Sequence, residues 1–147
     1  MFKEGHIYRF KSFVFRHGDS PKEKYFIVLK EIEDRLIIGT LPTRTNKIPV
    51  FVNIEHGCVY IEESQYNCYL FQKNKSICEN DFCFDMTTFI YGDDLEYYEI
   101  EKMLSNYPDE GKDYITMGKL INTEFNSILD CFRKSNAVKR GIRKQIQ

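Results

Sequence analysis

The chain has 147 residues, with 21 Lys and Arg against 22 Asp and Glu, and 42% of its residues are hydrophobic. This length predicts one domain, residues 1–147, and the composition excludes disordered, collagen-like and coiled-coil proteins. The longest apolar runs are a handful of residues, whereas a transmembrane helix needs roughly 20. Lys3, Glu4 and His6 interrupt the apolar stretch that a signal peptide requires. We therefore expect a cytoplasmic protein that does not enter a membrane.

Five cysteines leave at least one thiol unpaired within the chain, and no CxxC pair occurs among them. Structural zinc needs closely spaced ligands in two clusters, so the spacing predicts neither a metal site nor a cofactor held by cysteine. Cys68 and Cys83 have apolar and aromatic neighbours, and we expect both to pack as small hydrophobic side chains. This cysteine usage agrees with the cytoplasm.

The near-zero net charge hides a segregation of charge along the chain. Residues 1–50 carry ten basic and six acidic groups, whereas residues 51–113 carry four basic and fourteen acidic groups. Residues 132–147 form a basic tail with six basic groups and no acidic one. Such a tail is either a solvated amphipathic segment or a contact surface for nucleic acid or an acidic protein.

The first two-thirds of the chain has the pattern of β-structure. Residues 5–15 alternate roughly as in a half-buried strand, and residues 17–23 have loop composition. Residues 24–31 are almost continuously apolar, which predicts a central strand buried on both faces. Residues 35–41 are its natural hairpin partner, where Gly39 marks a bulge or a close approach of the backbone.

Further short strands follow an exposed loop that lies between two prolines. They are predicted over residues 50–54, 58–62, 66–72 and 82–90. Strands this short and closely spaced favour a small barrel or sandwich over a parallel α/β sheet.

Helical patterns appear late in the chain. Residues 93–107 fit either one helix or a strand followed by a helix, and Pro108 ends the segment. Residues 122–134 predict an amphipathic helix that Asn122 or Thr123 caps. Its apolar face consists of Phe125, Ile128, Leu129 and Phe132.

Four short motifs occur in a familiar order. Gly5-His6-Ile7 opens a strand, and KYFIVL over residues 24–29 forms the next apolar strand. Leu41-Pro42-Thr43 ends the third strand, with Thr45 as an alternative register, and Met117-Gly118-Lys119-Leu120 precedes the last predicted helix. In this order the chain resembles the PemK/MazF-like toxin family. Lys24 and Tyr25 stand where that family has an Arg-Pro pair.

The resemblance implies an α+β fold that is mainly β, an SH3-like antiparallel barrel with a C-terminal helix. It also implies a toxin of a toxin–antitoxin system, a homodimer that cleaves single-stranded RNA through a 2′,3′-cyclic phosphate without a metal ion. Lys24 and Thr43 match the catalytic positions, although a lysine lacks the bidentate fork of arginine. The expected RNA-binding residues around them are Arg16, His17, Lys22, Arg44, Thr45 and Lys47.

Other interpretations stay open at this point. Lys22 and Lys24 also fit solvated charges beside a strand, in which case a non-catalytic barrel binds RNA or a protein partner. A third possibility is an interaction protein that uses the tail over residues 132–147. His17 suits acid–base chemistry but sits in a loop, whereas His6 and His56 are expected to be structural. Aromatic side chains that face the surface can stack on RNA bases, and the candidates are Tyr66, Tyr69, Tyr97 and Tyr98; the sequence does not choose among them.

Overall fold

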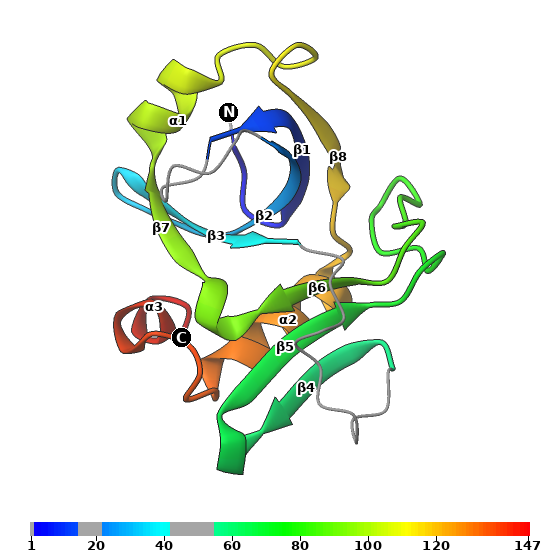
Figure 1. Cartoon of the computed structure of the whole chain (residues 1–147), viewed down its shortest axis with the longest axis vertical. Helices are drawn as coiled ribbons and strands as arrows, with labels where there is room; N and C mark the ends of the chain where they lie inside the picture. The colour runs from blue at the N-terminus through cyan, green and yellow to red at the C-terminus, as the bar shows by residue number, and fades with distance from the viewer. Residues whose placement is uncertain (1, 15–21, 42–54) are drawn as a thin grey trace.

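The computed structural model describes residues 2–14, 22–41 and 55–147 (Figure 1). In chain order its elements are β1 (His6–Phe13), β2 (Lys22–Ile32), β3 (Arg35–Thr40), β4 (Gly57–Ile61), η1 (Glu62–Ser64), β5 (Tyr66–Phe71), β6 (Thr88–Tyr91), η2 (Gly92–Asp94), β7 (Glu96–Glu99), α1 (Ile100–Asn106), β8 (Tyr114–Lys119), α2 (Asn122–Arg133) and α3 (Arg140–Gln145). Sheet A has the strand order β7-β3-β2-β1-β8, and sheet B has the order β4-β5-β6. All neighbouring strands in both sheets are antiparallel.

Sheet A curls strongly, and Figure 1 looks into the curl. Its edge strands β7 and β8 are not hydrogen-bonded to each other within the described residues, so the sheet stays open. The chain crosses from one edge to the other through α1 and the connection to β8, so a helix spans the gap instead of a strand pair. The mainly β, antiparallel α+β fold with a C-terminal helix is thus confirmed, whereas the expected closed barrel is not.

The inner face of sheet A buries an aromatic core. Phe26 of β2 lies at its centre, with its ring centroid 4.9 Å from that of Phe10 and 4.4 Å from that of Phe13. Met103 of α1 and the adjacent Tyr107 cover this core from the open side. Each favourable aromatic pair adds about 0.5–1.5 kcal/mol beyond the area that it buries.

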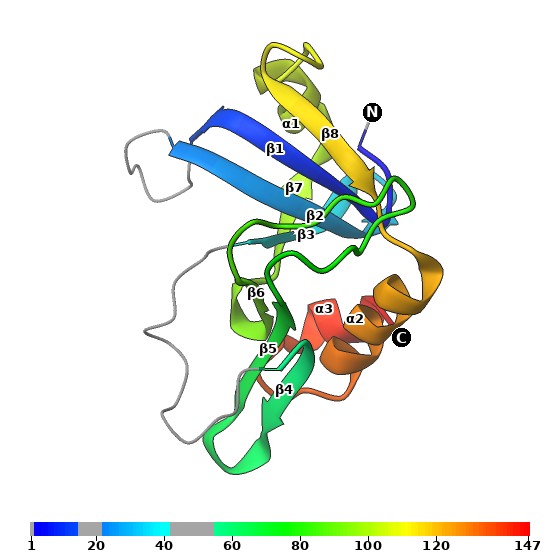
Figure 2. The same cartoon turned by 90° about the vertical axis from the view of Figure 1, so that its right-hand side faces the viewer.

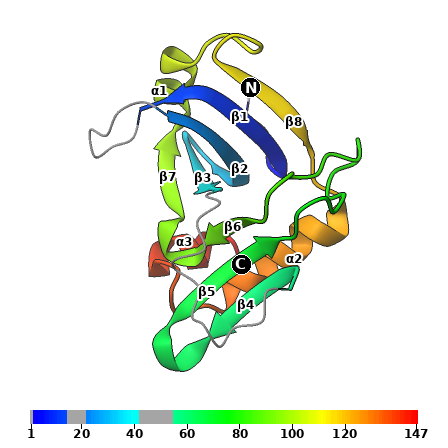
Figure 3. The same ribbon diagram turned by 45° about the vertical axis from the view of Figure 1, so that its right-hand side comes forward.

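The outer face of sheet A buries a second core against sheet B, α2 and α3, which lie side by side in Figures 2 and 3. Ile27 and Leu29 of β2 point into it, while Phe26 and Val28 point into the aromatic core. All four are at most 1% exposed. This double burial confirms the prediction of a central strand from the continuous apolar run.

The later elements match the sequence patterns only in part. Residues 93–107 form a strand followed by a helix, which is one of the two expected arrangements. Helix α2 begins where expected, but its N-cap is Ile121 and no side chain caps it, so the predicted Asn122 or Thr123 cap is wrong. Of the strand expected over residues 82–90, only the part from Thr88 onward is extended.

The basic tail is folded onto the second core. Val138, Ile142 and Ile146 are each at most 2% exposed, which anchors α3 beside α2. Several tail cations bind groups of the protein itself: Lys139 contacts Glu96 at 2.5 Å, and Arg143 donates to the carbonyl oxygen of Ser135 at 3.0 Å. The segment is therefore packed on the protein, and part of its positive charge is paired within the fold.

Gly39 of β3 is a point of close approach. A Cβ atom at this position would lie 2.7 Å from Cγ2 of Ile90 and 3.3 Å from Cδ2 of Leu95. The side chains of Ile90 from sheet B and of Leu95 just before β7 therefore pack directly on the β3 backbone, as one of the two sequence interpretations expects.

Gly39→Ala is expected to lower the free energy of unfolding by about 1–3 kcal/mol, because the added methyl group overpacks the second core. Urea unfolding followed by circular dichroism measures this change. Gly141→Ala is the matched control: its Cβ would meet only the Tyr97 hydroxyl at 4.0 Å, and alanine favours a helix over glycine by up to about 1 kcal/mol. Equal effects of the two substitutions would contradict the close approach.

Candidate functional site

Two of the sequence-predicted site residues lie at the start of β2. Lys22 is exposed and stands opposite Phe13, and Lys24 is half-buried opposite Phe10. Because directly paired residues share a face of a sheet, Lys24 lies on the face that carries the aromatic core. The other six predicted residues, Arg16, His17, Thr43, Arg44, Thr45 and Lys47, lie outside the described residues.

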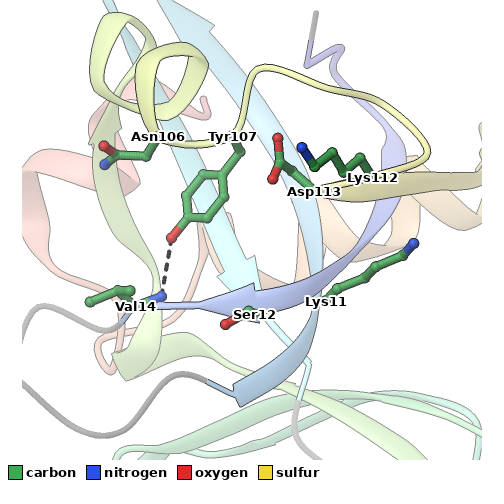
Figure 4. Close-up of a pocket in the computed structure, with 7 residues that line it drawn as sticks. All are labelled: Lys11, Ser12, Val14, Asn106, Tyr107, Lys112 and Asp113. Atoms are coloured by element: carbon green, nitrogen blue, oxygen red, sulfur yellow. Dashed lines mark hydrogen bonds between the residues drawn. The ribbon is translucent and has the colours of Figure 1, made fainter.

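A groove lies at this same end of sheet A, between the end of β1 and the connection from α1 to β8 (Figure 4). Its volume is about 450 Å³. The residues that line it are Lys11, Ser12, Val14, Asn106, Tyr107, Lys112 and Asp113. A second hollow of about 400 Å³ on the α1 side shares Val14, Asn106 and Tyr107 with it, so the two adjoin.

Hydrogen bonds between distant segments shape the groove. The backbone N–H of Val14 donates to the Tyr107 hydroxyl at 3.1 Å, which ties the end of β1 to the end of α1 (Figure 4). The Lys11 ammonium group donates to the carbonyl oxygen of Gly111 at 2.8 Å, and the Lys11 backbone N–H donates to that of Asp113 at 3.1 Å. Asp113 in turn accepts the Asp109 backbone N–H through its carboxylate.

Cationic and anionic side chains both occur at this end of sheet A. Lys11 and Lys112 line the groove, and Lys22 and Lys24 lie at the start of β2, so three separate segments contribute four lysines to this end of the sheet. Asp113 is the carboxylate on the same groove wall. Ammonium groups with an exposed hydroxyl at Ser12 suit the binding of phosphodiesters, whose affinity comes largely from cations.

Sequence reasoning missed Arg9. It lies in β1 opposite Tyr25 of β2 and Ile115 of β8, and no motif singles it out. Its Nε atom is buried and has no hydrogen-bond partner. Only the register of β1 against its neighbours shows that this guanidinium stands on the same end of sheet A as the lysines.

His56 belongs to a separate polar network between sheet B and α2. Gln72 donates its backbone N–H to Nδ1 of His56 at 3.1 Å, so the ring proton is on Nε2, which donates to Glu124 at 2.5 Å. The Tyr69 hydroxyl donates to the same carboxylate oxygen at 2.8 Å. Both ring nitrogens of His56 are therefore used within the fold, which supports its expected structural role.

Glu124 is a buried carboxylate held by this network. Burial alone would raise its pKa, but the hydrogen bonds from His56 and Tyr69 outweigh burial and hold the pKa below the ordinary value of 4.5. Burial also raises the pKa of Tyr69, which keeps the phenol protonated as a donor. Of the four tyrosines that are candidates for the surface, Tyr69 is only 2% exposed, while Tyr66, Tyr97 and Tyr98 are half-buried.

A disulfide joins Cys58 of β4 to Cys131 of α2, with a Cα–Cα distance of 5.5 Å. This pairing departs from the cysteine usage that agreed with a reducing compartment. Cys68 is buried as expected, whereas Cys83 is exposed, so the expectation that it packs in a core is wrong. Burial raises the pKa of the Cys78 thiol to about 12.

Within the part of the chain that the structure describes, no group of three or more His, Cys, Asp or Glu side chains is placed to hold a metal ion. In the same residues, no helix has the length and apolar character needed to cross a bilayer. Comparison with protein-family models, curated proteins and solved structures gives no match.

Cys58→Ser is expected to lower the free energy of unfolding by about 2–4 kcal/mol, because the cross-link between β4 and α2 restricts the unfolded chain. Urea unfolding with and without dithiothreitol measures this loss of stability. The reductant should lower the free energy of unfolding of the wild type but not that of the variant. Cys83→Ser is the control, since this exposed thiol makes no disulfide, and it should change the stability by less than about 0.5 kcal/mol. An unchanged Cys58→Ser protein would mean that the disulfide does not form.

Glu124→Gln is expected to lower the free energy of unfolding near pH 7 by about 1–3 kcal/mol, because charge-assisted hydrogen bonds become neutral ones. The lowered pKa means that the folded protein binds fewer protons than the unfolded chain, so wild-type stability falls as the pH drops below 4.5. The gap between wild type and variant should therefore shrink in urea unfolding at about pH 3. The exposed Glu79→Gln is the control, and a gap of constant size would contradict an ionised Glu124.

Proposed function

We propose that the chain binds single-stranded RNA along the groove at the lysine-rich end of sheet A and cleaves it, as the PemK/MazF-like resemblance implies. The observation that carries the proposal is an open groove of about 450 Å³ lined by Lys11 and Lys112, with Lys22 and Lys24 at the start of β2, which pairs with the end of β1. A groove of this shape and charge accommodates a sugar-phosphate chain and offers no deep apolar pocket for a small molecule.

The proposed reaction is an internal transesterification. The RNA 2′-oxygen attacks the adjacent phosphorus and loses its proton to a base, the P–O5′ bond breaks, and the 5′-oxygen receives a proton. The products are a 2′,3′-cyclic phosphate and a 5′-hydroxyl end. A cation beside the phosphorane stabilises its negative charge, and the resemblance assigns this role to Lys24. The resemblance makes Thr43 the second catalytic residue, through its side-chain hydroxyl. The nucleophile belongs to the substrate, so the scheme needs no metal-bound water.

A non-catalytic RNA-binding or protein-binding module is the second candidate. It is favoured by the replacement of the family's arginine by Lys24, because an ammonium group lacks the bidentate fork that binds two phosphate oxygens. It is also favoured by the histidines of the described residues: His56 is engaged by Gln72 and Glu124, and His6 contacts the Glu4 carbonyl oxygen. Neither ring lines the groove.

The proposal includes partners and a compartment. A second copy of the chain and an antitoxin protein are the partners that the resemblance implies. An RNA substrate implies work in the cytoplasm, where the bond between Cys58 and Cys131 would be kept reduced. The active form in that compartment would then be the dithiol, held at the β4–α2 contact by the His56–Glu124 hydrogen bond.

The test is to incubate purified protein and a long unstructured RNA with EDTA and to map new 5′-hydroxyl and cyclic-phosphate ends. Wild type should cleave, and Lys24→Ala and Thr43→Ala should each abolish cleavage. Unchanged cleavage by both variants would refute the assigned residues. Intact RNA together with salt-dependent binding would establish the non-catalytic module instead.

The groove itself is tested by the double variant Lys11→Ala/Lys112→Ala. RNA binding should weaken at least about tenfold, and the slope of log K against log salt should fall by about 1.4, because each phosphate contact on a single strand contributes about 0.7. The matched control is Lys134→Ala/Lys144→Ala, which removes the same charge from exposed positions beside α2 and on α3. Equal losses in both pairs would show nonspecific attraction and not binding in the groove.

A further inference from the structure

Arg9 has a buried atom whose hydrogen-bonding capacity is unused. Its Nε is buried without a hydrogen-bond partner, and no carboxylate of the protein forms an ion pair with its guanidinium group in the structure as described. A buried donor that loses its water and gains no acceptor destabilises the folded protein. Such a group calls for a specific explanation, and a bound ion that supplies the missing acceptor is one such explanation.

The position of Arg9 in sheet A shows where that ligand would lie. Arg9 alternates with Tyr8 and Phe10, which point into the aromatic core, so its side chain lies on the outer face of the sheet. Ile7 occupies the same face and is buried in the second core, while Lys11 is exposed. Arg9 therefore stands at the border between the buried and the solvent-facing part of the outer face.

Tyr25 completes the site from the neighbouring strand. It is the direct partner of Arg9 in the antiparallel pair, so the two side chains leave the same face with their Cβ atoms about 4.5–5.5 Å apart. The Tyr25 ring packs against Phe82 and Phe84, with centroid distances of 6.4 and 5.2 Å, which holds it in place. Its hydroxyl makes no hydrogen bond within the described residues.

Two unused donors thus lie side by side: a guanidinium that forms two parallel hydrogen bonds to a planar or tetrahedral oxyanion, and a phenolic O–H that adds a third. Lys11 follows two residues along β1, about 6.6–6.8 Å further on, and lines the groove described above. Glu23 lies on the same face beyond Tyr25 and forms no ion pair with Arg9. This donor set suits an oxyanion that is part of a chain leading into the groove.

We propose that Arg9 and Tyr25 bind one phosphodiester group of a single-stranded RNA and direct the strand along β1 to Lys11. The identity of the ligand rests on the proposed function; the existence of an oxyanion site does not. Arg9 is a binding residue here, and the proposal gives it no part in bond cleavage.

The experiment measures binding of a fluorescent 2′-O-methyl oligouridine, which cannot be cleaved by 2′-hydroxyl attack, by anisotropy over a series of salt concentrations. Arg9→Gln should weaken binding on the order of tenfold and reduce the salt slope by about 0.7. Arg9→Lys should keep the slope and still lose affinity, because it keeps the charge but not the fork. Tyr25→Phe should lose affinity without a change of slope.

Arg140→Gln is the matched control, since it removes one arginine charge from an exposed position on α3. If Arg9→Gln behaves like Arg140→Gln, the inference is overturned while the proposed function stands. Should Arg9→Gln fail to fold by circular dichroism, Arg9→Lys and Tyr25→Phe decide the matter alone.

A parallel measurement separates the site from the RNA. Inorganic phosphate is titrated against wild type and Arg9→Lys, with 31P line broadening as the readout. Phosphate binding that depends on Arg9, without any RNA binding, supports the oxyanion site and refutes the proposed function. Binding of neither phosphate nor oligouridine by the wild-type protein overturns both.

Discussion

The double burial of β2 is the constraint on which the rest of the structure depends. Phe26 and Val28 enter the aromatic core on one face of sheet A, and Ile27 and Leu29 enter the second core on the other. A slip of one residue would exchange every one of these side chains between two cores of different shape, so the register of β2 is fixed from both sides. The fixed register of β2 also fixes the positions of the polar residues at its ends, although these residues do not themselves determine the register.

This constraint explains why the fold was more predictable than its details. The apolar run of β2, its hairpin with β3 and the amphipathic helix α2 are local patterns, and all three are found. Strand β8 was missed because its residues, YITMGK, are mostly half-exposed and β1 is its one partner among the strands described. Helix α3 was missed because it is short, contains Gly141 and is held by Val138 and Ile146 from outside its own span.

The candidate site shows a stronger limit of sequence reasoning. The predicted members lie in contiguous segments, yet the groove joins Lys11 to Gly111 across 100 positions of the chain. Arg9 becomes a candidate binding residue because it lies opposite Tyr25, and this pairing depends on the register between β1 and β2. Likewise, neither spacing nor composition pairs Cys58 with Cys131, because their proximity follows from the packing of α2 on β4. Local patterns determine elements, whereas long-range register determines which side chains meet.

The bond between Cys58 and Cys131 spans 73 positions and encloses β5 to β8, α1 and most of α2 in a covalent ring. Strand β8 lies within the ring and pairs with β1, which lies outside it. An ATP-driven protease that threads the polypeptide from its C-terminus would pull α3 out of the second core and then meet this ring at Cys131. To continue, its channel would have to admit two strands of polypeptide at once. Reduction opens the ring, so the thiol state of two residues sets how far such a machine can advance.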